Sequence, residues 1–126
     1  MSLVGVWQLV EYLVELEDGR TIKPWGDDFL GYTVVSEEGF VSSSMIKTNV
    51  EDNVAKDSFF SYLGSFELFG DMVRISVAIC SEPGLVGSVQ ERRIVFIGDT
   101  FTANTPDMDW DGTKGINKLT WKRVYR

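Results

Sequence analysis

The stretches LVGVWQL (residues 3–9) and LTWKRV (residues 119–124) decide the fold that this 126-residue chain is expected to adopt. In the first stretch, Gly5 precedes Trp7 by two residues at the start of a run of alternating apolar side chains, which is the pattern of a β-strand. The second stretch carries Trp121 and Arg123. Because a guanidinium can stack on an indole face, we expect the two ends to pair and close a β-barrel.

Alternation with a period of two recurs along most of the chain in segments of strand length. The segments run over residues 4–17, 30–36, 40–47, 59–68, 72–79, 87–97, 101–104 and 116–125. Turn-forming pairs such as Asp18-Gly19 and Gly70-Asp71 separate several of them. Eight strands in meander order can close and remove their free edges, so the sequence predicts an all-β fold, an eight-stranded antiparallel up-and-down β-barrel. An open two-sheet sandwich is the alternative with the same number of strands.

Length and composition indicate a single domain over residues 1–126. The chain is 44% hydrophobic and 25% charged, which is average for globular proteins and argues against disorder. No apolar run approaches the roughly 20 residues of a membrane-spanning helix. The strand pattern also begins within a few residues of Met1, without the features of a secretory leader. We therefore expect a cytoplasmic protein with no membrane partner.

The net charge and two residue counts exclude several classes of function. A formal net charge of −7 repels phosphate backbones, so nucleic acid is not an expected partner. The single cysteine, Cys80, excludes an internal disulfide and multi-cysteine metal motifs. The absence of histidine excludes Ser-His-Asp and Cys-His catalysis and histidine-bound zinc. The sequence therefore predicts no metal ion, no cofactor and no catalytic residue.

Short motifs occur in a recognisable order along nearly the whole chain. They are residues 3–9, Asp18-Gly19-Arg20, Pro24-Trp25-Gly26-Asp27, Gly31-Tyr32, Gly39-Phe40, Tyr62 with Gly64, Val86-Gly87, Gln90-Glu91-Arg92-Arg93 and residues 119–123. This order closely resembles the family of short bacterial and fungal lipocalin-like domains. The resemblance implies an eight-stranded barrel with a central cavity, similar to carriers of small apolar molecules. Where many members carry histidine after the Gly-Asp turn, this chain has Ile75 and Ser76.

An inward Trp7 fixes which other side chains face the barrel interior, because side chains alternate along a strand. Glu11 then faces inward as well, unless a bulge reverses the alternation. The Gln-x-Arg spacing of the family places Gln90 and Arg92 inside. The predicted ligand-binding residues are Glu11, Phe60, Tyr62, Phe66, Gln90 and Arg92. Trp7, Trp121 and Arg123 are assigned to barrel closure.

An inward arginine is costly to bury without a partner, so Arg92 requires a carboxylate or the anionic group of a ligand. Glu11 is the one carboxylate with an inward assignment. The functional interpretation is that Arg92, Gln90, Tyr62 and Glu11 orient a ligand in an otherwise apolar cavity. The structural interpretation is a buried ion pair, or an Arg92 that points into solvent.

Three functions are consistent with these residues. The first is an uncharacterised lipocalin-like protein that binds a small, mostly apolar molecule with a polar or acidic group. The second is a small isomerase or cyclase of a biosynthetic pathway with Glu11 as the base; the chain has no evident nucleophile, so the balance is against an enzyme. The third is a filled barrel that forms a homodimer through a patch around Trp25 and Trp110. Residues 48–57 are the candidate lid.

Overall fold

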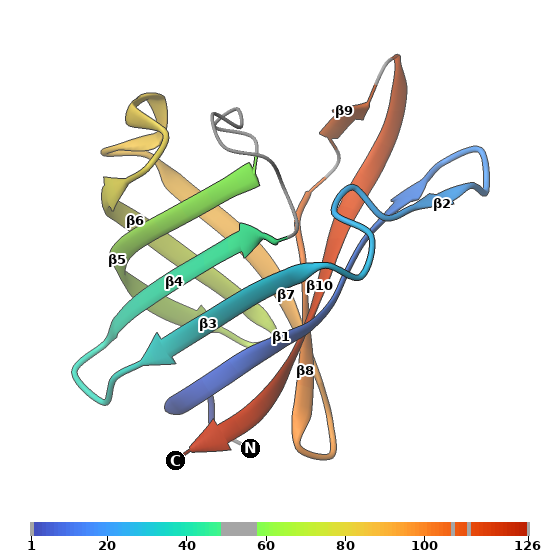
Figure 1. The fold of residues 1–126 in the computed structure, drawn as a ribbon. Coiled ribbons are helices and arrows are strands. Elements are labelled where there is room, and N and C mark those ends of the chain that lie inside the picture. Colours follow the sequence, from blue (N-terminus) through green and yellow to red (C-terminus); the bar gives the residue numbers. More distant parts are fainter. Residues whose placement is uncertain (1, 49–57, 107, 111, 126) are drawn as a thin grey trace.

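The computed structural model describes residues 2–48, 58–106, 108–110 and 112–125, which are almost entirely β-structure (Figure 1). The strands are β1 (Gly5–Leu16), β2 (Thr21–Ile22), β3 (Phe29–Val35), β4 (Phe40–Lys47), β5 (Phe59–Phe69), β6 (Met72–Cys80), β7 (Val89–Ile97), β8 (Thr100–Asn104), β9 (Met108–Trp110) and β10 (Thr113–Tyr125). A short 3-10 helix, η2 (Pro83–Leu85), connects β6 to β7. In the described part of the chain, no helix is long and apolar enough to cross a membrane.

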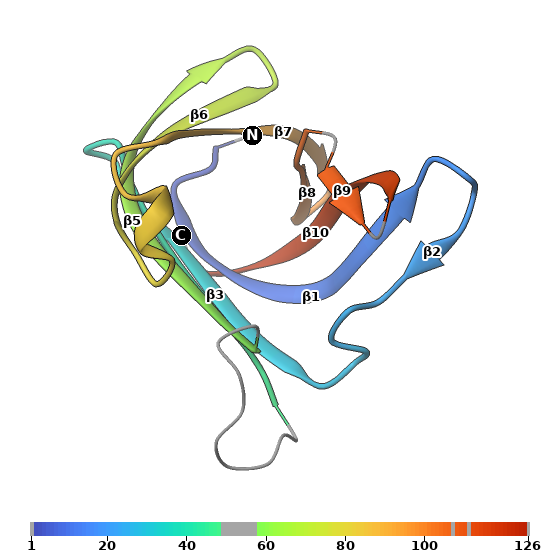
Figure 2. The ribbon, with the colours of Figure 1, turned by 90° about the horizontal axis from the view of Figure 1, so that it is seen from above.

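Eight of the strands form a closed antiparallel barrel in the order β1-β3-β4-β5-β6-β7-β8-β10, and β10 pairs with β1 to complete the ring (Figure 2). The closing pair is long: it runs from Val6 opposite Tyr125 to Leu16 opposite Gly115. The predicted eight-stranded up-and-down barrel is therefore confirmed, and the open sandwich is wrong. Because both ends of the chain lie in paired strands, neither β1 nor β10 leaves a free edge along the barrel.

Two short strands were not predicted from the sequence. Thr21–Ile22 (β2) pairs with Val14 and Glu15 of β1, and β9 pairs with residues 113–115 of β10. Both extend hairpins past the upper end of the barrel in Figure 1. Segments of two and three residues are too short to show a period of two, so alternation could not reveal them.

The lower end of the barrel is sealed by a contact between its first and last strands. The guanidinium carbon of Arg123 lies 4.1 Å from the ring centroid of Trp7, which is completely buried. Arg123 donates hydrogen bonds to the carbonyl oxygens of Val4, at 2.9 Å, and Ser2. The indole Nε1 of Trp7 donates to the carbonyl oxygen of Leu3 at 2.8 Å. These bonds hold residues 2–4 across the barrel end.

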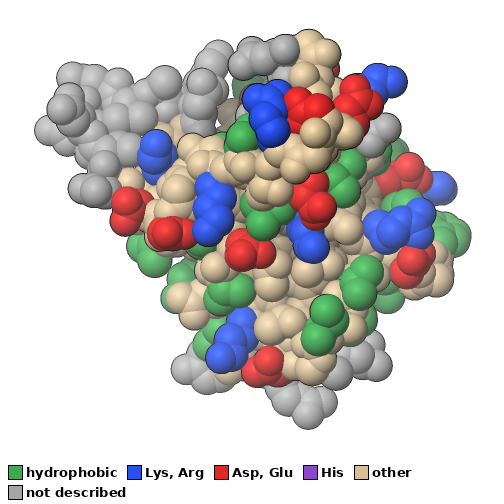
Figure 3. Space-filling view, turned by 90° about the vertical axis from the view of Figure 1, so that its right-hand side faces the viewer, with side chains coloured by type: hydrophobic (Ala, Val, Ile, Leu, Met, Phe, Trp, Pro, Cys, Tyr) green, Lys and Arg blue, Asp and Glu red, His purple; other side chains and the backbone are tan. Residues whose placement is uncertain are grey.

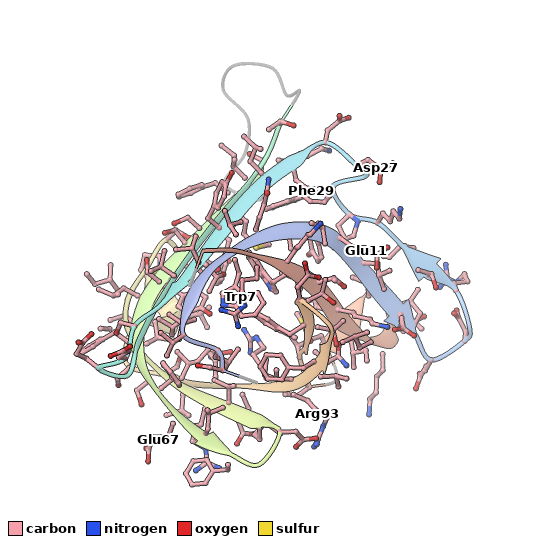
Figure 4. All side chains as sticks on the ribbon, turned by 90° about the horizontal axis from the view of Figure 1, so that it is seen from below. Trp7, Glu11, Asp27, Phe29, Glu67 and Arg93 are labelled. Carbon is pink, nitrogen blue, oxygen red and sulfur yellow. The ribbon has the colours of Figure 1, made fainter. Side chains whose placement is uncertain are left out.

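Aromatic rings pack on the same seal from inside. Phe101 of β8 meets Trp7 edge to face with 4.6 Å between centroids, and Phe96 of β7 lies 5.9 Å from Phe101. Figure 4, seen from below, places Trp7 within the ring of strands, whereas Glu67 and Arg93 point outward from the wall. The Gly-x-Trp motif is explained by the backbone here, because Gly5 has φ 138°, a conformation that side-chain-bearing residues rarely adopt.

The outer surface carries charges of both signs. Figure 3 shows one side of the molecule, on which acidic and basic side chains are interspersed with hydrophobic ones. Two of the ion pairs on the outer wall join Arg74 to Glu91 and Arg93 to Asp71. Their side chains are about half exposed, so each contributes little to stability.

We expect Arg123→Ala to lower the free energy of unfolding by roughly 2–3 kcal/mol, because it removes a cation–π contact and two hydrogen bonds from a charged donor. Urea unfolding followed by tryptophan fluorescence measures this loss. The matched control is Arg93→Ala, which removes an exposed ion pair and should cost less than about 1 kcal/mol. Equal losses in the two variants would show that the seal is no stronger than a surface pair.

Gly64 provides a second test of the wall, since it lies at the register shift between β5 and β6. A Cβ at this position would clash with the carbonyl oxygen of Ser76. We therefore expect Gly64→Ala to destabilise the barrel by about 1–3 kcal/mol, the usual range for overpacking. Gly84→Ala, where a Cβ meets no atom within 4 Å, should leave the unfolding midpoint nearly unchanged.

Candidate functional site

The barrel encloses a cavity of about 870 Å³, whose lining extends from Leu3 and Phe101 beside the Trp7 seal to Trp25 and Leu85 in the connections between strands. Its volume lies within the range of about 300–1,000 Å³ that is usual for small-molecule sites. Every barrel strand contributes side chains to its lining, and most of them are apolar. A cavity of this size is inconsistent with a barrel filled by its own side chains.

Apolar residues line the lower part of the cavity and its mouth. Leu3 and Phe101 line it beside the seal, and Trp121 lies against its wall with 4% of its surface exposed. At the mouth, Trp25 also lines the cavity and packs edge to face on Tyr12, with 5.4 Å between ring centroids.

Trp25 is only 8% exposed. The expected dimer patch around Trp25 and Trp110 is therefore wrong for Trp25, which packs inward against Tyr12. The side chain of Trp110 lies outside the described residues, as do residues 49–57 of the candidate lid.

Five of the six predicted ligand-binding residues line the cavity: Phe60, Tyr62, Phe66, Gln90 and Arg92. They come from β5 and β7. Both faces of β7 carry charged and apolar residues, so alternation alone did not show which face is inside. In the structure, Gln90, Arg92 and Ile94 face the cavity. Arg93 lies on the outer surface, where it donates a hydrogen bond to Asp71 at 2.8 Å. The cavity therefore holds an arginine in its wall.

Glu11 does not belong to the described lining of the cavity, and its predicted inward position is wrong. The pairing of β1 with β10 shifts register between Leu9 and Glu11, which marks a β-bulge. Beyond the bulge, Glu11 is opposite Thr120 and Tyr12 is opposite Leu119. Paired residues point to the same side of a sheet, and Tyr12 and Leu119 both line the cavity, so Glu11 faces outward. It cannot serve as a base within the cavity.

The outward position of Glu11 removes the carboxylate that the sequence had offered as a partner for Arg92. Among the described residues, the hydrogen bond from Arg92 Nη1 is donated at 2.8 Å to the backbone carbonyl of Glu91, and no described acidic side chain forms an ion pair with it. Burial lowers the pKa of Arg92, while Tyr62 acts in the opposite direction. The charged guanidinium has therefore lost part of its hydration on burial.

Tyr62 and Gln90 are the neighbouring polar groups. Burial raises the pKa of the Tyr62 phenol, and the positive charge of Arg92 partly offsets this effect. The phenol is therefore neutral at physiological pH and can donate a hydrogen bond. The amide of Gln90 donates to Ser88 Oγ at 2.9 Å, which holds its side chain in place beside the cavity. The cavity thus offers a cation and a phenolic donor in an apolar setting.

Thr33 and Ser43 are polar lining residues that the sequence interpretation missed. Their hydroxyl oxygens are 2.9 Å apart, from adjacent strands β3 and β4. The run Ser42-Ser43-Ser44 weakened the predicted alternation of this strand. Val41 and Met45 on either side are apolar and buried, and this was the available signal that Ser43 faces inward with them.

Comparison with known families and structures agrees with the geometry. The sequence profile of the lipocalin-like domain family matches residues 4–124. A comparison with curated proteins finds no match.

Two solved structures share the fold. A lipocalin-like protein from Bacteroides uniformis ATCC 8492 is 17% identical, with a TM-score of 0.52 over 97% of this chain and 98% of that one. An uncharacterized protein from Bacteroides eggerthii DSM 20697 is 15% identical, with a TM-score of 0.51 over 98% of this chain and 100% of that one. At these identities the likeness is one of fold.

Proposed function

This chain belongs to the family of lipocalin-like domains, and from that premise we propose that it binds a small, mostly apolar molecule with an acidic group in the barrel cavity. The observation that carries the proposal is Arg92, a lining residue that forms no ion pair with a described carboxylate, although Glu82 also lines the cavity. A ligand anion would supply the missing partner. The aromatic and aliphatic lining would bind the rest of the molecule.

The size and polarity of the cavity support this class of ligand. A cavity of about 870 Å³ accepts a molecule of drug size. Phe60 and Phe66 provide aromatic surface on the same strand as Tyr62, whose hydroxyl can donate to an anionic oxygen. Burial of the apolar part contributes roughly 25 cal/mol per Å² removed from water, and a charge-assisted hydrogen bond selects the head group.

The location of the positive charge favours selectivity for anions. The protein as a whole has a net charge of −7, which repels large polyanions such as nucleic acids. Within the cavity, in contrast, Arg92 is a cation in a lining that is mostly apolar. The proposal also includes a cytoplasmic location, where reducing conditions would keep Cys80 free.

Isothermal titration calorimetry with decanoic acid, decanol and decylamine tests the proposal, because these three ligands share a tail and differ in head group. We expect the acid to bind most tightly and the amine most weakly. Native mass spectrometry of protein purified from its natural source would identify a retained ligand. Failure of all three ligands to bind, with no retained molecule, would contradict the proposal.

Replacing the lining arginine should remove the preference for an acid. We expect Arg92→Leu to weaken decanoic acid binding by roughly ten- to a hundredfold, since a charge-assisted hydrogen bond contributes about 1.5–3 kcal/mol. Decanol binding should change little. The control is Arg93→Leu, one position along β7 and on the outer surface, which should keep the wild-type affinity for both ligands. An equal loss in both variants would show that the head group does not meet Arg92.

Decanoic acid binding should also depend on pH. An anion that binds Arg92 has a lower carboxyl pKa when bound than when free, so its affinity is full above the free pKa of about 4.5. The affinity falls as the pH drops through and below this value. Titrations between pH 8 and pH 4 should show this fall for decanoic acid and a flat profile for decanol. A flat profile for both would argue against an ionic contact.

A further inference from the structure

A second polar group in the cavity lies apart from Arg92. Thr33 and Ser43 are the buried polar side chains of the described core, with exposures of 6% and 4%. Both line the cavity, and neither borders the outer surface. Buried hydroxyls require hydrogen-bond partners, because an unpaired polar group in an apolar environment is costly.

The hydroxyl groups of Thr33 and Ser43 do not use all of their hydrogen-bond donors and acceptors. Two hydroxyl groups hold two protons, and the bond between the Thr33 and Ser43 oxygens uses one of them. Within the described part of the chain, no further hydrogen bond involves either hydroxyl. One O–H group therefore remains to be donated at the cavity wall, and lone pairs on both oxygens remain to accept.

Thr33 of this pair lies on the strand across the barrel from the strand of Arg92. In the closed order of strands, β4, β5 and β6 separate β3 from β7 on one side, and β8, β10 and β1 separate them on the other. Thr33 on β3 and Arg92 on β7 therefore belong to opposite walls (Figure 2). Ser43 is also directly opposite Tyr62 in the pairing of β4 with β5, so hydroxyls follow the wall from β3 to β5.

We propose that the ligand carries, besides its acidic group, a second oxygen, a hydroxyl or a carbonyl, that binds the Thr33–Ser43 pair. This inference rests on the proposed function and narrows the ligand to hydroxy- or oxo-carboxylic acids with an apolar skeleton. The acidic group binds Arg92 on one wall. The second oxygen completes the hydrogen bonds of the hydroxyl pair on the other wall and fixes the orientation of the skeleton between them.

The test compares decanoic acid with a series of hydroxydecanoic acids that carry the hydroxyl at successive carbons. We expect at least one isomer to bind the wild-type protein roughly three- to tenfold more tightly than decanoic acid, the gain of one net hydrogen bond. Without a matching partner, an added hydroxyl should weaken binding, because it must leave water to enter an apolar cavity.

The double variant Thr33→Val/Ser43→Ala removes both hydroxyls, a change that can be nearly neutral for folding when both partners become apolar. It should abolish the preference for the hydroxy acid over decanoic acid, measured as the ratio of the two affinities in the same variant. The matched control is Ser44→Ala/Ser61→Ala, which removes a hydroxyl pair of similar geometry, 2.8 Å apart, from the outer face. The control should retain the full preference.

The possible results separate this inference from the proposed function. Binding of decanoic acid with no gain for any hydroxy acid would overturn the inference and leave the proposed function standing. A preference that survives in the double variant would also overturn it. If the double variant does not fold, the single variants Thr33→Val and Ser43→Ala replace it, and each should reduce the preference. Absence of binding by every acid would overturn both proposals.

Discussion

The stacking of Arg123 on Trp7 is the interaction on which the rest of the structure depends. It joins the first strand to the last at the position where residues 2–4 cross the barrel end, and Arg123 also binds the backbone of that segment. The stacked pair closes one end of the barrel, and Leu3 and Phe101 line the cavity beside this contact. This contact also places aromatic rings at the inner end of the cavity.

The β-bulge in β1 has the largest effect on the chemistry of the cavity. Without it, Glu11 would lie inside with Trp7 and Leu9 and could neutralise Arg92. The shift in register places Tyr12 inside in its stead, where its ring packs on Trp25. One extra residue in β1 thus places Glu11 on the outer surface. Among the described residues, Arg92 then forms no ion pair.

The sequence predicted the parts of this structure that depend on long periodic patterns. The eight barrel strands and their closure follow from alternation and from the paired terminal motifs. Tyr62 follows from the period on β5, whereas the alternation on β7 was ambiguous and the inward position of Arg92 came from the Gln-x-Arg spacing of the family. The bulge was not predicted, because a single inserted residue leaves an apolar pattern such as Leu9-Val10-Glu11-Tyr12-Leu13 readable in either phase. Ser43 was missed because a serine side chain is common on the outer face of a strand and is also tolerated on the inner face, where its hydroxyl can form a hydrogen bond.

The polar lining residues of the cavity use only part of their hydrogen-bonding capacity within the described protein. Burial of Arg92 costs hydration free energy that the described protein atoms only partly recover, through the carbonyl oxygen of Glu91. The Thr33–Ser43 pair likewise keeps one hydroxyl proton undonated. Folding has already met these costs, so a ligand that supplies the missing partners gains the interactions without further desolvation of the protein at those atoms. If the proposed ligand binds, groups that are already in place on two walls would favour a molecule with two suitably spaced oxygens and an apolar body.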